Sequence, residues 1–331
     1  METKKEGFPA AFWVCACTEI FERLAYYLGR SLILIFVTAS VATGGLSDTV
    51  AANMQSNLTA FSYLLPLFGA VIVDKYIGAR YTTPVGMFIA AAGYFTGGIA
   101  KSSAGVYAMI FLVSLGLALF KNGAIIGRVI TDKSQMDPAF SMRYTLVNVG
   151  AFIGTFLVGI LYKDVFAKDG VLGFAPCFKM AALMMVLGGL WYIFVCWRFL
   201  GDLGKLPFKK TLTEEEKAAE AKKKEETGTK QPLTTIEKKR IGAIFVASLF
   251  SIVFWIFWYL GYMPVYFYWA ENMDWVVAGY QVPSTWFDAA NSLFCVILGP
   301  VTAALWKKLA ARPQGDMSLF RKTGLGIAII G

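Results

Sequence analysis

The chain has 331 residues, of which 57% are hydrophobic and 16% charged, and it carries a formal net charge of +9. Charged residues make up about 25% of an ordinary soluble protein, so this composition excludes a soluble globular domain and indicates an all-α membrane protein with several spans. The positive charge does not indicate nucleic-acid binding, because Lys and Arg lie in short connections between apolar blocks of membrane-spanning length.

The rarer residue types exclude several kinds of chemistry. There is no histidine, so His-based catalytic triads and the usual zinc sites are absent. The five cysteines have no CxxC spacing and are predicted to be buried thiols. Without a nucleophile elbow or a phosphate-binding loop either, we expect no enzyme, no metal and no cofactor. If the protein handles protons, buried carboxylates must carry them.

The first predicted helix, residues 12–38, contains an unusual group of polar side chains. On a helix that turns about 100° per residue, six of them fall within an arc of about 140°. They are Glu19, Glu22, Arg23, Tyr26, Tyr27 and Arg30. A charge at the centre of a membrane helix costs about 2.5–3.5 kcal/mol. This face is therefore predicted to point into a helix bundle or a water-filled cavity, with its charges paired.

The following apolar blocks predict helices at residues 53–73, 81–100, 104–130, 144–162 and 177–200. Residues 1–200 are thus predicted to form a six-helix bundle, and residues 201–240 a charged cytoplasmic linker. Helices at 241–262 and 284–306 and the start of a ninth at Thr323 are predicted to form part of a second bundle, residues 241–331. Since the last apolar run is too short to cross a bilayer, we expect the chain to be a fragment of a symmetric protein.

The links after the second, fourth, sixth and eighth predicted helices are basic. This pattern places the amino terminus in the cytoplasm. The first of these links is a tight turn whose notable residues are Gly69, Asp74, Gly78 and Arg80. The two glycines permit a close approach and a sharp turn, and Asp74 can cap the next helix or pair with a nearby basic group.

Several motifs resemble those of one transporter family. The turn resembles the cytoplasmic loop signature of the major facilitator superfamily. Glu19-x-x-Glu22-Arg23 resembles the ExxER motif of the proton-coupled oligopeptide transporter (POT/PTR) family within it. The segments that begin at Leu119, Tyr144 and Val282 resemble that family's LFKPN, FYxxINxG and IPASWFQxxN segments, although the proline of the first is missing.

The resemblance implies a twelve-helix carrier that imports di- and tripeptides with protons by alternating access. It implies a multi-pass protein of the plasma membrane, such as the inner membrane of a bacterium, whose partners are small peptides, protons as the coupling ion, and the lipid bilayer. The residues that match the family's proton-coupling cluster are Glu19, Glu22, Arg23 and Lys121. Those that match its peptide-binding positions are Tyr26, Tyr27, Arg30, Tyr63, Asn148 and Asn291.

One departure concerns a glutamate that the family carries on its seventh helix. Here Tyr259 and Leu260 stand where Glu-Gln is expected, so a carboxylate that would pair with Arg30 is missing. Asp288, which shares a helix face with Asn291, is a candidate substitute. The alternative for Asp288 is a residue near a helix start that the helix dipole favours.

Other interpretations stay open. The charged face could be a static network of ion pairs that holds helices together. The missing glutamate also allows a proton-coupled carrier of another small solute, such as an amino acid, nitrate or a drug-like compound. A sensor or scaffold without transport is a third possibility, and the charges of the first helix argue against it.

Overall fold

The computed structural model describes residues 7–39, 45–131, 135–208, 234–260, 268–310 except 270, and 319–330. Most of the predicted linker, residues 209–233, lies outside this part of the chain. Contacts divide the chain into two units, Met1–Thr211 with Val277–Ile297, and Leu212–Val276 with Leu298–Gly331. The first unit thus takes up residues that the sequence assigned to the second bundle. The boundaries at 200 and 240 stay predictions.

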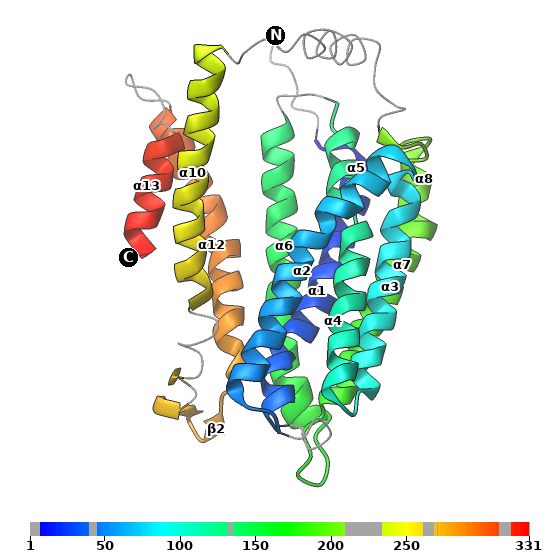
Figure 1. Cartoon of the computed structure of the whole chain (residues 1–331), viewed down its shortest axis with the longest axis vertical. Coiled ribbons are helices and arrows are strands. Elements are labelled where there is room, and N and C mark those ends of the chain that lie inside the picture. The colour runs from blue at the N-terminus through cyan, green and yellow to red at the C-terminus, as the bar shows by residue number, and fades with distance from the viewer. Residues whose placement is uncertain are drawn as a thin grey trace. The chain divides into compact units, whose positions relative to one another are not determined.

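The first unit is a bundle of helices that run side by side (Figure 1). Its elements are α1 (Ala10–Ala39), α2 (Asp48–Lys75), α3 (Ala79–Ile99), α4 (Ser103–Leu119), α5 (Asn122–Val129), α6 (Met136–Ile160), the π-helical turn η3 (Leu161–Val165), α7 (Phe174–Trp191), the π-helical turn η4 (Tyr192–Cys196) and α8 (Trp197–Leu200).

Five helical segments in the described part of the chain are long and apolar enough to cross a membrane. They are Asp48–Lys75, Ser103–Val129, Pro138–Val165, Phe174–Leu200 and Thr235–Leu260. The helix α1 has 30 residues, about 45 Å, which also exceeds the thickness of a bilayer core, although it carries charged side chains. An all-α polytopic membrane protein is therefore confirmed.

Two predicted spans differ from the observed helices. The span expected at 104–130 is interrupted at Phe120 and Lys121, so that α4 ends and α5 begins there. The span expected from Tyr144 begins eight residues earlier, at Met136. Pro138 is the third residue of α6, a position whose N–H has no partner inside a helix, so proline is tolerated. Arg143 precedes the helix predicted at 144–162, but in the structure it lies inside α6.

Small residues let the helices approach closely. A side chain at Gly69 of α2 would lie 2.0 Å from the Ala118 carbonyl oxygen of α4. Side chains at Gly150 and Gly154 of α6 would lie 2.9 Å and 2.7 Å from the backbone oxygens of Ile20 and Leu24 in α1. These contacts resemble the packing of small residues that is common between membrane helices. At Gly150 and Gly154, α6 is therefore in direct contact with the backbone of α1.

The second unit contains α10 (Thr235–Leu260) and α13 (Leu319–Ile330), and α12 (Thr285–Ala310) is divided between the units after Ile297. A short hairpin, β1 (Val276–Val277) and β2 (Tyr280–Gln281), precedes α12. Its two turn residues, Ala278 and Gly279, have φ angles of 51° and 79°, as a type I′ turn requires.

The hairpin is hydrogen-bonded to η3, which directly follows α6. The Tyr280 hydroxyl donates to Asp164 at 2.8 Å, and Lys163 Nζ donates to the Gln281 carbonyl oxygen at 2.7 Å. The bond to Asp164 raises the pKa of the Tyr280 phenol, because it stabilises the protonated form. Trp286 at the start of α12 also stacks on Phe156, with ring centroids 4.6 Å apart. These contacts place the first turns of α12 in the first unit.

Candidate functional site

The polar face of α1 is buried inside the first unit. Glu19 and Glu22 are 2% and 0% exposed, and Arg30 is 8% exposed. Apolar neighbours on the opposite side of the helix, such as Leu28 and Leu32, are buried as well. Because protein surrounds α1, its charges do not meet lipid. The prediction that this face points into a helix bundle is confirmed.

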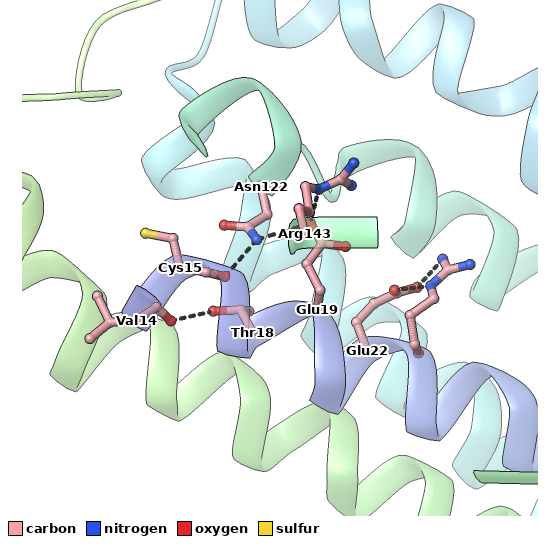
Figure 2. A network of polar contacts seen from close by, with 8 residues as sticks. Val14, Cys15, Thr18, Glu19, Glu22, Asn122 and Arg143 are labelled. Carbon is pink, nitrogen blue, oxygen red and sulfur yellow. Dashed lines mark hydrogen bonds and ion pairs between the residues drawn. The ribbon is translucent and has the colours of Figure 1, made fainter. Parts of the chain in front are cut away.

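Glu19 contacts two other helices (Figure 2). Arg143 Nε of α6 donates to Glu19 Oε1 at 3.0 Å, and this contact is an ion pair. Asn122 Nδ2 of α5 donates to the same oxygen at 3.0 Å and to the Cys15 carbonyl oxygen at 2.8 Å. Arg143 lies seven residues before Gly150, two helical turns on the same face, and therefore on the side pressed against α1.

Glu22 has a partner on its own helix. It forms an ion pair with Arg23, whose Nη2 lies 2.6 Å from Glu22 Oε1. The Arg23 guanidinium also lies 4.9 Å from the centre of the Tyr26 ring, a cation–π distance. The charges expected to pair on this helix are thus paired, one acid locally and the other across to α6.

Lys121, which the resemblance places in the same cluster as the acids, contacts another helix. Its Nζ donates to the Pro66 carbonyl oxygen of α2 at 2.9 Å. The cause is the break between α4 and α5, because it places the neighbouring residue Asn122 against α1 and directs Lys121 to α2. A role of Lys121 in proton coupling stays a prediction.

Arg30 lies on the buried face of α1, and its guanidinium is 5.8 Å from the centre of the Tyr27 ring. Asp288 of α12 is half-buried, as is Asn291 on the same helix. That Asp288 replaces the missing glutamate of the seventh helix stays a prediction.

The remaining predicted binding residues are less closely grouped. Tyr63 of α2 is 66% exposed. Asn148 of α6 is buried, and its amide donates to the Tyr144 carbonyl oxygen of its own helix at 2.9 Å. Their role in substrate binding stays a prediction.

The turn after α2 is fixed by its backbone and by Arg80. A side chain at Gly78 would lie 2.1 Å from the Gly204 carbonyl oxygen, so only glycine fits there. Arg80 Nη2 donates to the Trp197 carbonyl oxygen at 3.0 Å, and its backbone N–H donates to that of Gly204 at 3.0 Å. Arg80 thus donates to backbone carbonyl groups of α8 and of the residues that follow it. Asp74 does not cap α3, whose N-cap is Gly78.

Sequence reasoning missed Arg143 and Asn122. Both occupy positions where the sequence departs from the motifs it resembles, since Arg143 stands at the phenylalanine of FYxxINxG and Asn122 at the proline of LFKPN. These two departures from the motifs were the signal in the sequence that could have found them. The structure then shows both side chains bound to the same Glu19 oxygen.

Comparisons with known proteins agree with this fold. The family model PTR2, described as the POT family, matches residues 202–331. A di-/tripeptide transporter of Lactococcus lactis subsp. cremoris is 23% identical over 378 residues, which cover 98% of this chain and 74% of that protein. An uncharacterized transporter of Bacillus subtilis, YclF, is 23% identical over 367 residues, covering 98% and 72%.

Solved structures are similar over nearly the whole chain. A mutant of a peptide transporter POT in complex with alafosfalin has a TM-score of 0.80 at 24% identity and covers 98% of this chain and 74% of that one. A POT family transporter in complex with 5-aminolevulinic acid has a TM-score of 0.80 at 22% identity and covers 97% and 75%.

The fold of this chain is that of the solved POT transporters, a polytopic helical membrane fold. Over residues 202–331 the chain is similar to the POT family model, and nearly its whole length is similar to a di-/tripeptide transporter.

Proposed function

We propose that this protein carries di- and tripeptides across a membrane together with protons, by alternating access. The observation that carries the proposal is the buried charged face of α1, where Glu19, Glu22 and Arg30 lie inside a bundle of membrane-length helices. Arg30 of α1 and Asp288 of α12 supply one positive and one negative group for the substrate. A peptide is a zwitterion, so a guanidinium can bind its carboxylate bidentately while a carboxylate binds its amino group. The di-/tripeptide transporter of Lactococcus lactis supports this choice of substrate.

The coupling ion is the proton, and the groups that carry it are the buried carboxylates of α1. Glu19 and Glu22 are almost completely excluded from solvent, and each is paired with an arginine. A proton that neutralises one of these acids releases its arginine, so protonation and side-chain rearrangement are linked. The protein lies in a plasma membrane, as in a bacterial inner membrane, with its amino terminus in the cytoplasm.

Uptake into proteoliposomes that contain the full-length protein tests the proposal. Labelled dialanine is expected to accumulate under an inward proton gradient and only to equilibrate without one. No accumulation under the gradient would contradict the proposal.

The Glu22→Gln variant distinguishes a proton carrier from a static ion pair. We expect it to exchange labelled for unlabelled dialanine but to lose accumulation driven by the gradient. A variant that is unstable and yet retains proton-driven uptake would indicate a static network.

A second candidate is a proton-coupled carrier of another small solute, because Tyr259 and Leu260 of α10 stand where the family has Glu-Gln. Competition by unlabelled amino acids or nitrate, with no competition by dialanine, would favour it.

A further inference from the structure

Arg143 is a partly exposed arginine that contacts α1 and has no role in the motifs. It lies in the second turn of α6, and its Nε donates to Glu19 Oε1 at 3.0 Å. Glu19 is 2% exposed, whereas 29% of the Arg143 side chain is exposed. The acid is therefore enclosed, whereas part of the base is accessible. Figure 2 shows the two side chains in contact.

The residues around the Arg143 guanidinium leave space for this group. A side chain at Gly123 of α5 would lie 3.1 Å from both Cζ and Nη2 of Arg143, so glycine at this position makes space for the arginine. The Phe140 ring lies 6.0 Å from Cζ, and Asn122 shares the oxygen that Arg143 binds. Three helices thus contribute to a site that fits an arginine paired with Glu19.

Other cations of the region are engaged elsewhere. Arg23 binds Glu22, and Lys121 binds the Pro66 carbonyl oxygen. Among the described residues, Arg143 is therefore the cation that pairs with Glu19.

The remaining groups near Glu19 belong to three elements. On α1 itself, Cys15 and Glu22 lie four and three residues from Glu19, about one helical turn away, and Asn122 of α5 is neutral. From η4, Cys196 lies beside Thr18, with 3.5 Å between sulfur and hydroxyl oxygen.

We propose that Arg143 controls the protonation of Glu19 and thereby couples protons to transport. This inference rests on the proposed function. Arginine does not lose its proton in proteins, so the pair opens only when a proton binds the Glu19 carboxylate. The neutral acid no longer holds the guanidinium, which moves toward its exposed side. When the proton leaves, the carboxylate binds Arg143 again.

The test compares Arg143→Gln with Arg143→Lys in the full-length protein. Loss of the positive charge favours protonated Glu19, so the infrared band of this carboxylic acid persists to higher pH in Arg143→Gln, by about one pH unit or more. The band is assigned by subtracting the spectrum of the matching Glu19→Gln variant. In the same variant, proton-driven accumulation of dialanine falls by about tenfold or more, while exchange changes by less than about twofold. Arg143→Lys restores most of both properties.

Arg128→Gln is the matched control, since Arg128 lies on α5 with its guanidinium 4.8 Å from the Phe208 ring centre, away from the acids. It is expected to leave the Glu19 band and the accumulation unchanged. An unshifted band in Arg143→Gln would overturn the inference, as would an equal loss of accumulation and exchange that Arg143→Lys does not restore. Failure of the unmodified protein to accumulate dialanine overturns the proposed function instead, and the infrared band still decides whether Arg143 controls Glu19.

Discussion

At the residue scale, the two acids of α1 differ in how their charges are balanced. Glu22 pairs with the next residue, Arg23, so the pair moves as one with the helix. Glu19 pairs with Arg143 of α6 and also accepts a bond from Asn122 of α5, so its surroundings depend on three helices. Glu19 is therefore the acid whose partners change if α1, α5 and α6 rearrange, whereas the partner of Glu22 stays with it.

Asn122 is predicted to stabilise this arrangement. Asn122→Ala removes two hydrogen bonds and leaves the Cys15 carbonyl and the Glu19 carboxylate with fewer donors. We expect a loss of about 1–3 kcal/mol, measured by thermal unfolding in detergent. The control is Thr145→Ala, which removes a solvent-exposed bond to the Ser141 carbonyl oxygen and is expected to change stability by less than about 0.5 kcal/mol. Equal stability of the two variants would contradict the assignment.

Asp288 is predicted to bind the substrate amino group opposite Arg30. Asp288→Asn removes this charge, and uptake of dialanine is expected to fall by about tenfold or more, which corresponds to about 1.4 kcal/mol. Asp274→Asn is the control, because Asp274 is exposed and accepts a bond from the backbone N–H of Val276. If uptake and its dependence on the proton gradient are the same in both variants, Asp288 is only a residue that the helix dipole favours.

At the element scale, close packing of helices decides which side chains meet. Glycines at 150 and 154 bring α6 onto α1, and Arg143 reaches Glu19 because it lies on the same face of α6. Lys121, by contrast, lies at the interruption between α4 and α5 and does not reach the acids of α1. Its ammonium group binds the Pro66 carbonyl oxygen of α2. The apolar pattern predicted that these helices exist, but it did not indicate the interruption.

The contact between α2 and α4 can be tested at Gly69. A side chain there would lie 2.0 Å from a backbone oxygen, which cannot move aside without separating the helices. Gly69→Ala is expected to destabilise the protein by about 1–3 kcal/mol, as measured by thermal unfolding. Gly242→Ala in α10 is the control, because nothing lies within 4 Å of its added carbon. That variant should gain up to about 1 kcal/mol from the higher helix propensity of alanine, and a similar loss in both variants would argue against close packing.

At the scale of the whole molecule, the chain is a multi-pass membrane protein whose first unit takes in the start of α12. Within this unit, the turn after α2 and the β1–β2 hairpin lie at the ends of membrane spans. The turn contains Lys75 and Arg80, and basic connections of this kind remain in the cytoplasm. The hairpin is therefore expected to face the other side of the membrane.

Labelling with a thiol reagent that cannot cross membranes tests this orientation. Tyr76 and Tyr280 are 71% and 41% exposed, so a cysteine at either position is accessible. In a background where the half-buried Cys17 and Cys295 are replaced by serine, Tyr280→Cys should react in intact cells, and Tyr76→Cys only after lysis. The reverse pattern would mean that the amino terminus lies outside.

The sequence by itself determined the all-α class, the spans and the buried charged face of α1, because the composition and spacing of apolar residues are local properties that a bilayer enforces. It also carried the motifs that resemble those of the POT family. Only the tertiary structure decided that Glu19 pairs with Arg143 and that Lys121 binds the Pro66 carbonyl oxygen. Such pairings depend on where helices begin, break and touch, which are properties of packing between segments distant in the chain.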